Sequence, residues 1–372
     1  MNSSVAIVKC PAYEPQLVSE AVESSLELLG GITSFIRPGS KVLLKPNLLM
    51  AKGPESGIDT HPEVLRAVIR ILKGINCRVL VGDGPSVWNN RAEEVEEVYR
   101  LSGTGRVCEE EEVELAVFER RRWRGSFPLT AYLDECNYLV SIPKFKTYEL
   151  TILTGAIKNN YGLVSGTYKT ELHRRNITVD NFSRVVVDVY QEARPALSIV
   201  DGITAMEGDG PGTGGTLRQE GLIVAGADAV AIDSVLALIM GLKPLDIATT
   251  RIAAERGLGT ADIAAIDILG ERLKEIIGKP FELPKTSLRR KIPLPLLHIA
   301  GKLVYFYPRI VQEKCLLCGT CIAICPRKAI RRKRERIVIH YAKCTSCFCC
   351  QESCPASAVK VNKSPLAKLL GL

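Results

Sequence analysis

Histidine is scarce in this sequence, which limits the chemistry that the chain can carry. Only four histidines occur among the 372 residues: His61, His173, His298 and His340. Serine–histidine–aspartate triads and histidine-rich metal sites are therefore not favoured. Any proton transfer would depend on lysine, aspartate or glutamate, which need burial and charged neighbours to reach a useful pKa.

Long apolar runs are also missing. No stretch of 18 apolar residues occurs, so the sequence predicts no membrane-spanning helix. Met1 leads almost directly into Val5-Ala6-Ile7-Val8, without the basic start and apolar core of a secretory signal. We therefore expect a cytoplasmic protein.

Cysteine, by contrast, is abundant and unevenly placed. Four of the 13 cysteines are scattered singly, as buried thiols in a reducing compartment would be. These four are Cys10, Cys77, Cys108 and Cys136. The other nine lie close together near the C-terminus, which indicates a metal or cluster site.

The clustered cysteines contain a duplicated motif. The copies are Cys315-x2-Cys318-x2-Cys321-x3-Cys325-Pro326 and Cys344-x2-Cys347-x2-Cys350-x3-Cys354-Pro355. Each cysteine of the first copy recurs 29 positions later, and Ala329 and Ala358 keep the same offset. This self-similarity indicates an internal duplication.

The spacing predicts two [4Fe–4S] clusters with crossed ligands. Three cysteines of a C-x2-C-x2-C turn hold one cube, and the fourth, before proline, ligates the other. Cluster one would be bound by Cys315, Cys318, Cys321 and Cys354, and cluster two by Cys344, Cys347, Cys350 and Cys325. The pattern resembles the bacterial-type two-cluster ferredoxin module.

Two alternatives stay open for these cysteines. Paired C-x2-C motifs also bind structural zinc in four-cysteine sites, although zinc needs neither the third cysteines nor the Cys-Pro endings. Cys349, beside Cys350, is either a spare thiol or a substitute ligand.

Positive charge is concentrated at the C-terminal end. Residues 287–372 carry 17 basic and three acidic residues, a net charge of +14, whereas residues 1–286 carry 32 and 38, a net of −6. The run Arg331-Arg332-Lys333-Arg334 with Arg336 is either a solvated turn or a docking patch for an acidic electron donor or acceptor. No nucleic-acid reader motif accompanies it.

Residues 1–285 alternate between short apolar strands and amphipathic helices. This alternation predicts an α/β domain with a mostly parallel sheet flanked by helices. The predicted strands are Val5–Lys9, Lys41–Lys45, Arg78–Gly82, Tyr138–Ile142, Ala196–Val200, Gly221–Ala225 and Ala265–Leu269. The predicted helices are Gln16–Leu29, Glu63–Ile75, Ala92–Leu101, Leu150–Ile157, Val179–Glu192 and Ala227–Met240.

Polar side chains follow four of these strands. Ligands of open parallel sheets bind beyond the carboxyl ends of the strands, so these residues predict a polar crevice. The candidate catalytic residues at the strand ends are Lys45, Asn47, Asp83, Lys144, Lys146 and Asp201. Four lysines, including Lys158, suit a carboxylate or phosphate, and the acids suit the lysines or a divalent cation such as Mg²⁺.

Two further stretches are candidates for the same crevice. Lys158 and Asn159 close an apolar helix, either as part of the site or as an ordinary helix end. The glycine-rich stretch with Glu207, Gly208, Asp209 and Gly210 is a substrate or cation loop, or else a plain connector. It matches neither a Walker A loop nor a dinucleotide fingerprint. Asp228 and Asp233 are further acids, or simply start a helix.

The motifs around these residues resemble an uncharacterised family, domain of unknown function 362. They include Lys45-Pro46-Asn47, Gly82-Asp83, Pro143-Lys144-x-Lys146, Gly155-Ala156-x-Lys158-Asn159, Asp201-Gly202-x5-Gly208-x-Gly210-Pro211 and Ala227-Asp228-x-Val230-Ala231-x-Asp233. The resemblance spans roughly residues 40–260. It implies a domain plan with a C-terminal two-cluster ferredoxin module, and it implies no reaction.

The sequence predicts an α/β domain at 1–285, a linker or strap at 286–307, a two-cluster domain at 308–363 and a tail at 364–372. The strap could instead contact a membrane surface. We expect an iron–sulfur oxidoreductase acting on an anionic small molecule. The alternatives are a non-enzymatic electron carrier or cluster-delivery subunit, and an ATP- or metal-dependent ligase or kinase.

Overall fold

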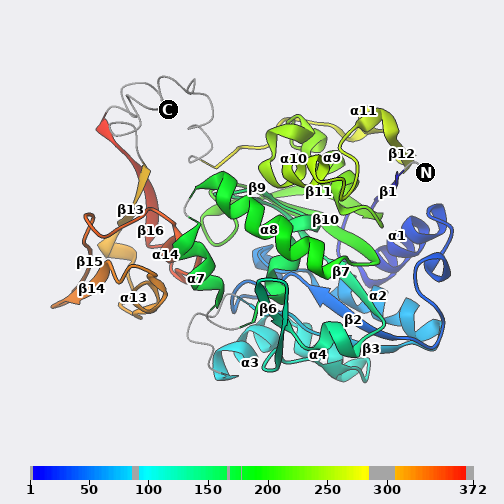
Figure 1. Cartoon of the computed structure of the whole chain (residues 1–372), viewed down its shortest axis with the longest axis horizontal. Helices are drawn as coiled ribbons and strands as arrows, with labels where there is room; N and C mark the ends of the chain where they lie inside the picture. Colours follow the sequence, from blue (N-terminus) through cyan, green and yellow to red (C-terminus); the bar gives the residue numbers. More distant parts are fainter. Residues whose placement is uncertain (1–2, 86–91, 166–167, 177, 285–305, 366–372) are drawn as a thin grey trace.

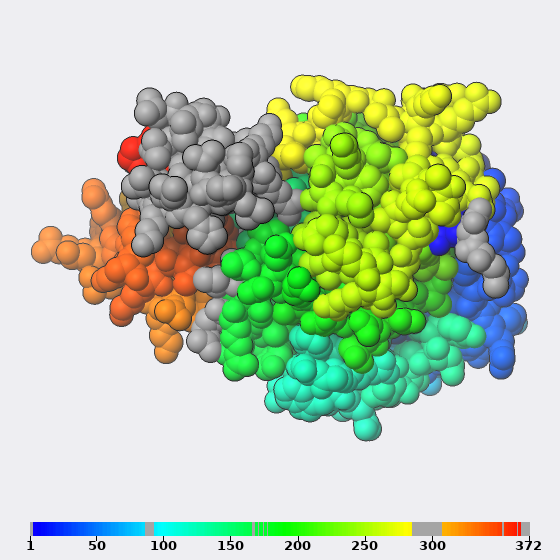
Figure 2. All heavy atoms as spheres, turned by 45° about the horizontal axis from the view of Figure 1, so that its top comes forward, coloured from blue at the N-terminus to red at the C-terminus, as the bar shows by residue number. Residues whose placement is uncertain are grey.

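The computed structural model describes residues 3–85, 92–165, 168–176, 178–284 and 306–365. Figure 1 shows a large α/β domain with a smaller C-terminal module at one side. In the space-filling view of Figure 2 the orange C-terminal module lies beside the green middle of the chain. Of the predicted strap at 286–307, only the last two residues are described, and the domain boundaries stay a prediction.

Ten strands form one mixed, mostly parallel sheet, which confirms the predicted fold class. The order is β12-β1-β11-β10-β7-β2-β3-β4, with β8 beside β10 and β9 beside β8. The strands are β1 (Ser3–Lys9), β2 (Lys41–Pro46), β3 (Arg78–Val81), β4 (Glu114–Leu115), β7 (Tyr138–Ile142), β8 (Lys144–Tyr148), β9 (Ile152–Thr154), β10 (Leu197–Gly208), β11 (Gly215–Gly226) and β12 (Ile266–Gly270). A separate hairpin consists of β5 (Arg121–Arg124) and β6 (Phe127–Thr130).

Helices cover both faces of this sheet (Figure 1). They are α1 (Pro15–Leu28), α2 (Pro62–Gly74), α3 (Ala92–Leu101), α4 (Thr104–Glu110), α5 (Tyr132–Glu135), α6 (Ala156–Asn159), α7 (Tyr168–Arg175), α8 (Val179–Ala193), α9 (Ala229–Ile239), α10 (Ala248–Glu255) and α11 (Leu273–Ile276). In β2, Val42 and Leu44 pack into the core with α1 and α2, whereas Leu43 packs into the core with α8 and α9. Successive strand residues point to opposite faces, so burial of both faces produces the unbroken apolar runs in the sequence.

The helix predicted over Leu150–Ile157 is wrong. Its centre forms β9, antiparallel to β8, and helix α6 begins only after it. Ile152, the first residue of β9, has a φ of 69° and Gly155, directly after β9, is extended, so the backbone is not helical at either end of the strand. A short buried strand and a buried helical turn give the same apolar pattern, and here pairing with β8 decides between them.

The C-terminal module contains two antiparallel strand pairs and two short helices. The pairs are β13 (Phe306–Ile310) with β16 (Val359–Lys363) and β14 (Ile330–Lys333) with β15 (Arg336–Ile339), and the helices are α13 (Thr320–Ile324) and α14 (Cys349–Glu352). The duplication is visible in the backbone. Left-handed φ angles at Leu317, Gly319 and Lys328 recur at Ser346, Phe348 and Ser357, each 29 residues later.

Among the described residues, no helix has both the length and the apolar character needed to cross a bilayer. The cytoplasmic location stays a prediction.

Candidate functional site

The predicted crevice residues gather at the carboxyl ends of the parallel strands. Six of the eight candidate catalytic residues are at most 2% exposed: Lys45, Asp83, Lys144, Lys146, Asn159 and Asp201. Lys45 lies near the end of β2, Asp83 follows β3, and Asp201 in β10 faces β8. Burying polar groups costs free energy unless each has a hydrogen-bond or ion-pair partner. We therefore expect each of these six residues to have such a partner.

Lys45 and Asp83 form one buried ion pair. Lys45 Nζ lies 2.7 Å from Asp83 Oδ1 and donates a hydrogen bond to Asn159 Oδ1 at 3.2 Å. The other carboxylate oxygen accepts the backbone N–H of Leu48 at 2.8 Å. A Cβ on Gly162 would lie 2.2 Å from Asp83 Oδ1, so a glycine is required beside this pair.

Lys144 and Asp201 form a second buried pair, with a distance of 2.8 Å between Nζ and Oδ2. The hydroxyl of Tyr13 donates to Asp201 Oδ1 at 2.8 Å and accepts from Lys144 Nζ at 2.6 Å. The ring of His61 stacks on Tyr13 at a centroid distance of 3.7 Å. Burial lowers the pKa of His61 to about 4, so this imidazole is neutral at physiological pH.

Lys146 and Asp59 are a third buried pair of opposite charge; they interact electrostatically, with no direct ion pair or hydrogen bond between them, and sequence analysis missed Asp59. Lys146 Nζ donates to the carbonyl oxygen of Ile58, and Asp59 Oδ1 accepts the N–H of Leu49 at 2.5 Å. Asp59 Oδ2 has no hydrogen-bond partner among the described residues. Burial raises the pKa of Asp59 to about 7 and lowers that of Lys146 to about 7, and each is the largest charge acting on the other. In sequence, Asp59 was hidden because it lies three residues before the start of α2, in a segment where an aspartate is ordinary.

Two more lysines complete the basic cluster. Lys158 Nζ lies 3.8 Å from the centroid of the Tyr148 ring. Lys169 on α7 donates to the carbonyl oxygen of Gly84, and burial lowers its pKa to about 8. No pattern in the sequence marked Lys169, because the polar helix that carries it looks solvated. We call this set the lysine cluster: Lys45, Lys144, Lys146, Lys158 and Lys169, with Asp59, Asp83 and Asp201.

The remaining sequence candidates lie at the margin of this cluster. Asn47 donates its backbone N–H to Thr60 Oγ1 at 2.8 Å, and its side-chain oxygen has no partner among the described residues. Glu207 pairs with Arg218 at 3.1 Å and accepts the N–H of Glu282 at 3.0 Å. These contacts satisfy Glu207 within the protein, and the divalent cation stays a prediction.

Asp228 and Asp233 have structural contacts. Asp228 is the N-cap of α9, where Oδ1 accepts the N–H groups of Val230 and Ala231 at 2.8 and 3.1 Å. Asp233 lies inside α9 and accepts the N–H of Ala156 at 2.6 Å, at the start of α6. Burial raises the pKa of Asp233 to about 7. Both carboxylates therefore cap helix starts, and only Asp228 caps its own helix.

The glycine-rich loop, residues 208–215, joins β10 to β11 and contacts the C-terminal module. Thr213 Oγ1 donates to the carbonyl oxygen of Cys354 at 3.1 Å, and Ser357 Oγ donates to the carbonyl oxygen of Thr213 at 2.9 Å. From a second loop, Lys52 Nζ donates to the carbonyl oxygen of Pro355 at 3.2 Å. The two parts of the chain are thus hydrogen-bonded through the segment that follows α14.

The clustered cysteines surround two cavities in the C-terminal module. One cavity is lined by Cys315, Cys318, Cys321 and Cys354, the other by Cys325, Cys344, Cys347 and Cys350. Each cavity thus receives three cysteines from one copy of the motif and the fourth from the other. Four thiols around one cavity are a donor set that fits an iron–sulfur cube. The assignment of individual ligands stays a prediction, which this grouping supports.

The two alanines at the 29-residue offset make equivalent backbone hydrogen bonds. The N–H of Ala329 donates to Cys325 Sγ, and that of Ala358 donates to Cys354 Sγ, both at 3.2 Å. Hydrogen bonds to cluster sulfurs tune the reduction potential of a bound cluster. Cys349 lines neither cavity; it is fully buried and starts α14.

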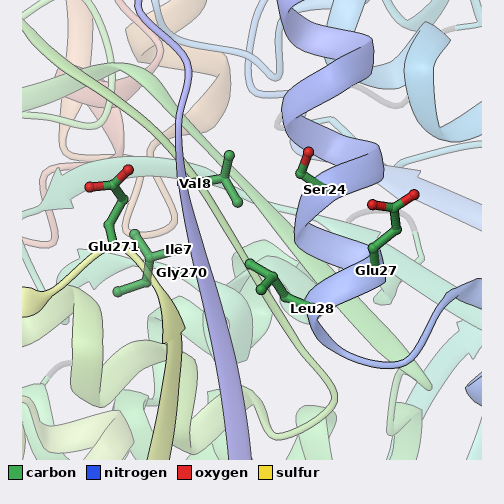
Figure 3. Close-up of a pocket in the computed structure, with 7 residues that line it drawn as sticks. All are labelled: Ile7, Val8, Ser24, Glu27, Leu28, Gly270 and Glu271. Carbon is green, nitrogen blue, oxygen red and sulfur yellow. The ribbon is translucent and has the colours of Figure 1, made fainter.

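A further hollow of about 470 Å³ lies between β1, α1 and β12 (Figure 3). Glu27 and Glu271 lie on its two sides, and Glu271 pairs with Lys9 at 2.8 Å. It is formed by the opposite edge of the sheet from β3 and β4, and none of the predicted site residues lines it.

A family model described as Domain of unknown function (DUF362) matches residues 42–237, more than half of the chain. The chain belongs to this family. A second model, a 4Fe-4S dicluster domain, matches residues 307–355, which contain all nine clustered cysteines. Both resemblances stated from the sequence are confirmed, and this DUF362 chain has an iron–sulfur electron-transfer role.

One curated relative covers most of the DUF362 chain. The Thylakoid-associated protein sll1697 of Synechocystis sp. (strain ATCC 27184 / PCC 6803 / Kazusa) is 29% identical over 321 residues, which is 84% of this chain and 97% of that protein.

Two solved structures are more distant. The lactate racemase apoprotein from Thermoanaerobacterium thermosaccharolyticum has a TM-score of 0.34 at 13% identity over 55% of this chain and 51% of its own. A Thermotoga maritima protein has a TM-score of 0.36 at 14% identity over 67% of this chain and 60% of its own.

Replacing Lys144 by Met should destabilise the protein strongly. Asp201, 0% exposed, would be left without its ammonium partner, and breaking a buried pair in this way costs about 3–5 kcal/mol. Arg78→Met removes a cation from the exposed pair with Glu114 and should cost about 0–1 kcal/mol. Urea unfolding of the anaerobically purified variants measures both, and equal losses of stability would contradict the account.

Substitution of Cys350, but not of Cys349, should remove one cluster. Wild-type protein reconstituted without oxygen should bind about eight irons per chain. Cys349→Ser should keep this value, because Cys349 lines neither cavity, and Cys350→Ser should lower it by about half. Iron and sulfide analysis measures the cluster content of both variants. Loss of half the iron in Cys349→Ser, with full iron in Cys350→Ser, would make Cys349 the ligand.

Proposed function

We propose that this DUF362 protein is an iron–sulfur oxidoreductase. The C-terminal module exchanges electrons with a redox partner and passes them to, or receives them from, an anionic small molecule held by the lysine cluster. The observation that carries the proposal is that one chain combines a two-cluster electron carrier with five gathered lysine side chains, joined by the loop contacts of Lys52 and Thr213.

The charge balance of the lysine cluster supports an anionic substrate. Two of its lysines, Lys45 and Lys144, are each paired with an aspartate. The cluster contains five lysines and three aspartates, and all of these residues except Lys158 are buried. A charged group in a low-dielectric site attracts an opposite charge more strongly than it would in water. A carboxylate or phosphate fits this excess.

The proposed ligands of the clusters are the two crossed sets that line the cavities. Cluster one is assigned to Cys315, Cys318, Cys321 and Cys354, and cluster two to Cys344, Cys347, Cys350 and Cys325. When bound, each cluster accepts and releases one electron. Burial raises the pKa of the Cys321 thiol to about 12, so the thiol loses a proton when metal binds.

The basic hairpin β14–β15 is the proposed docking site for the electron partner. Arg331, Arg332, Lys333, Arg334 and Arg336 are all exposed. The hairpin also supplies Ile330 and Ile337, which line the cluster-two and cluster-one cavities respectively. A partner drawn to the hairpin would therefore come close to both cavities, and positive charge favours an acidic one.

A second candidate function is electron delivery to a partner protein without chemistry in the α/β domain. The absence of a nicotinamide or flavin fingerprint from the sequence favours it. The two functions differ in whether a small molecule reoxidises the reduced protein.

Some small molecule that carries a carboxylate or phosphate ester together with a reducible group should accept the electrons and so reoxidise the reduced protein faster than buffer alone does. Lys158→Gln should weaken this reaction about tenfold in the apparent substrate affinity, because one attractive charge is lost. The control Lys274→Gln removes an exposed charge from α11 and should change nothing. Anaerobic stopped-flow absorbance measures the rates. A panel in which no compound accelerates reoxidation would reject the oxidoreductase and favour the electron carrier.

Charge reversal on the hairpin should slow electron entry from an acidic donor protein. Arg331→Glu with Arg334→Glu should lower the reduction rate about tenfold at low ionic strength, and the dependence on salt should weaken. Arg272→Glu at the N-cap of α11 with Lys274→Glu in α11 provides the same change of charge at exposed residues elsewhere. Equal slowing by both variants would show that net charge, and not the hairpin, controls docking.

A further inference from the structure

Both loops that hydrogen-bond to the C-terminal module also lead to the buried pair of Asp59 and Lys146. The first loop spans residues 47–60, between β2 and α2. It contacts Pro355 through Lys52 and carries Asp59 near its other end.

The glycine-rich loop reaches Lys146 by a different route. Its Thr213 binds the carbonyl group of Cys354, a ligand assigned to cluster one. At the start of the loop, Gly208 accepts a hydrogen bond at 2.9 Å from the hydroxyl of Thr147, the neighbour of Lys146 on β8. Gly210 packs so closely on Thr147 that a Cβ there would lie 2.5 Å from its carbonyl oxygen. A contiguous set of contacts therefore connects cluster one with both members of the pair.

The pair has room for one more proton. Asp59 is 4% exposed and Lys146 is 1% exposed, so neither exchanges freely with bulk water. Asp59 Oδ2 is buried and has no hydrogen bond of ordinary geometry among the described residues; the N–H of Met50 favours the charged carboxylate, but burial outweighs it. An unpaired carboxylate oxygen away from water is costly when charged and much less costly when protonated.

We propose that Asp59 and Lys146 form a proton-binding site whose occupancy is linked to the reduction of cluster one. Reduction adds one electron, supplied by the electron donor protein, and thus one negative charge to cluster one. That charge favours the uptake of one proton from solvent by the pair, and oxidation releases the same proton. By linkage, protonation of the pair must favour reduction of cluster one to the same extent.

Other charged groups act on the pair and set the pH at which it is half protonated. Those that act on it most strongly are Asp83, Lys144 and Lys158. Asp83 favours the protonated pair, and the two lysines disfavour it. Asp83, Lys144 and Lys158 are unchanged in the variants below. A change in the pH dependence of the cluster-one potential is therefore due to the pair itself.

The test is a redox titration of the cluster-loaded protein between about pH 5 and about pH 9, with the two clusters resolved by electron paramagnetic resonance. The potential of cluster one should fall as the pH rises through neutrality, with an upper limit of about 59 mV per pH unit for one proton per electron. Cluster two should be less dependent on pH. Asp59→Asn should flatten the response of cluster one, whereas Glu55→Gln, an exposed residue of the same loop, should preserve it.

A second measurement needs no variant. The infrared difference spectrum between the reduced and oxidised wild type should show the gain of a protonated carboxyl group on reduction. A reduction potential of cluster one that does not change with pH would overturn the inference, and so would a difference spectrum without this band. The inference depends on the proposed cluster ligands but not on a substrate. Protein that binds no reducible cluster would refute the proposed function, whereas reducible clusters without pH dependence would refute this inference alone.

Discussion

The burial of lysine ammonium groups at one end of the sheet is the constraint on which the α/β domain depends. Removing an ion from water costs several kcal/mol even after relaxation, so each buried lysine needs a counter-charge or has a lowered pKa. Asp83 and Asp201 supply a counter-charge at 2.7 and 2.8 Å, from the segment after β3 and from β10. The close approach of Gly162 to Asp83 shows how tightly the backbone is fitted around these charges.

The loops that enclose the charged residues also hold the C-terminal module. Thr213 hydrogen-bonds with Cys354 and Ser357, and Lys52 hydrogen-bonds to Pro355, next to the cavity of cluster one. The module is therefore held to the α/β domain by hydrogen bonds as well as by the covalent chain that precedes β13. In the proposed linkage, a change in charge at cluster one acts on contacts that continue to β8, where two of the buried lysines lie. The proposed electron transfer and the proposed chemistry of the α/β domain would thus share one set of contacts.

Much of this arrangement could be predicted because it depends on spacing and periodicity. The cysteine repeat gave the two crossed sets that line the cavities, and the strand ends gave most of the lysine cluster. Asp59 and Lys169 could not be predicted, since a helix-start aspartate and a lysine on a polar helix look ordinary until tertiary packing buries them. Strand β9 was mistaken for a helix because only its pairing with β8 distinguishes the two. The glycine-rich loop gave a pattern typical of ligand binding, and its contacts with the C-terminal module become visible only in three dimensions.

Hydrogen–deuterium exchange of the cluster-loaded protein in its oxidised and reduced states tests the central claim most directly. If the clusters and the lysine cluster form one unit, reduction should change the exchange rates of amides in residues 47–60 and 144–148, while helix α1 stays unchanged. Changes confined to residues 306–365 would contradict the account, because the C-terminal module would then act independently of the domain that it contacts.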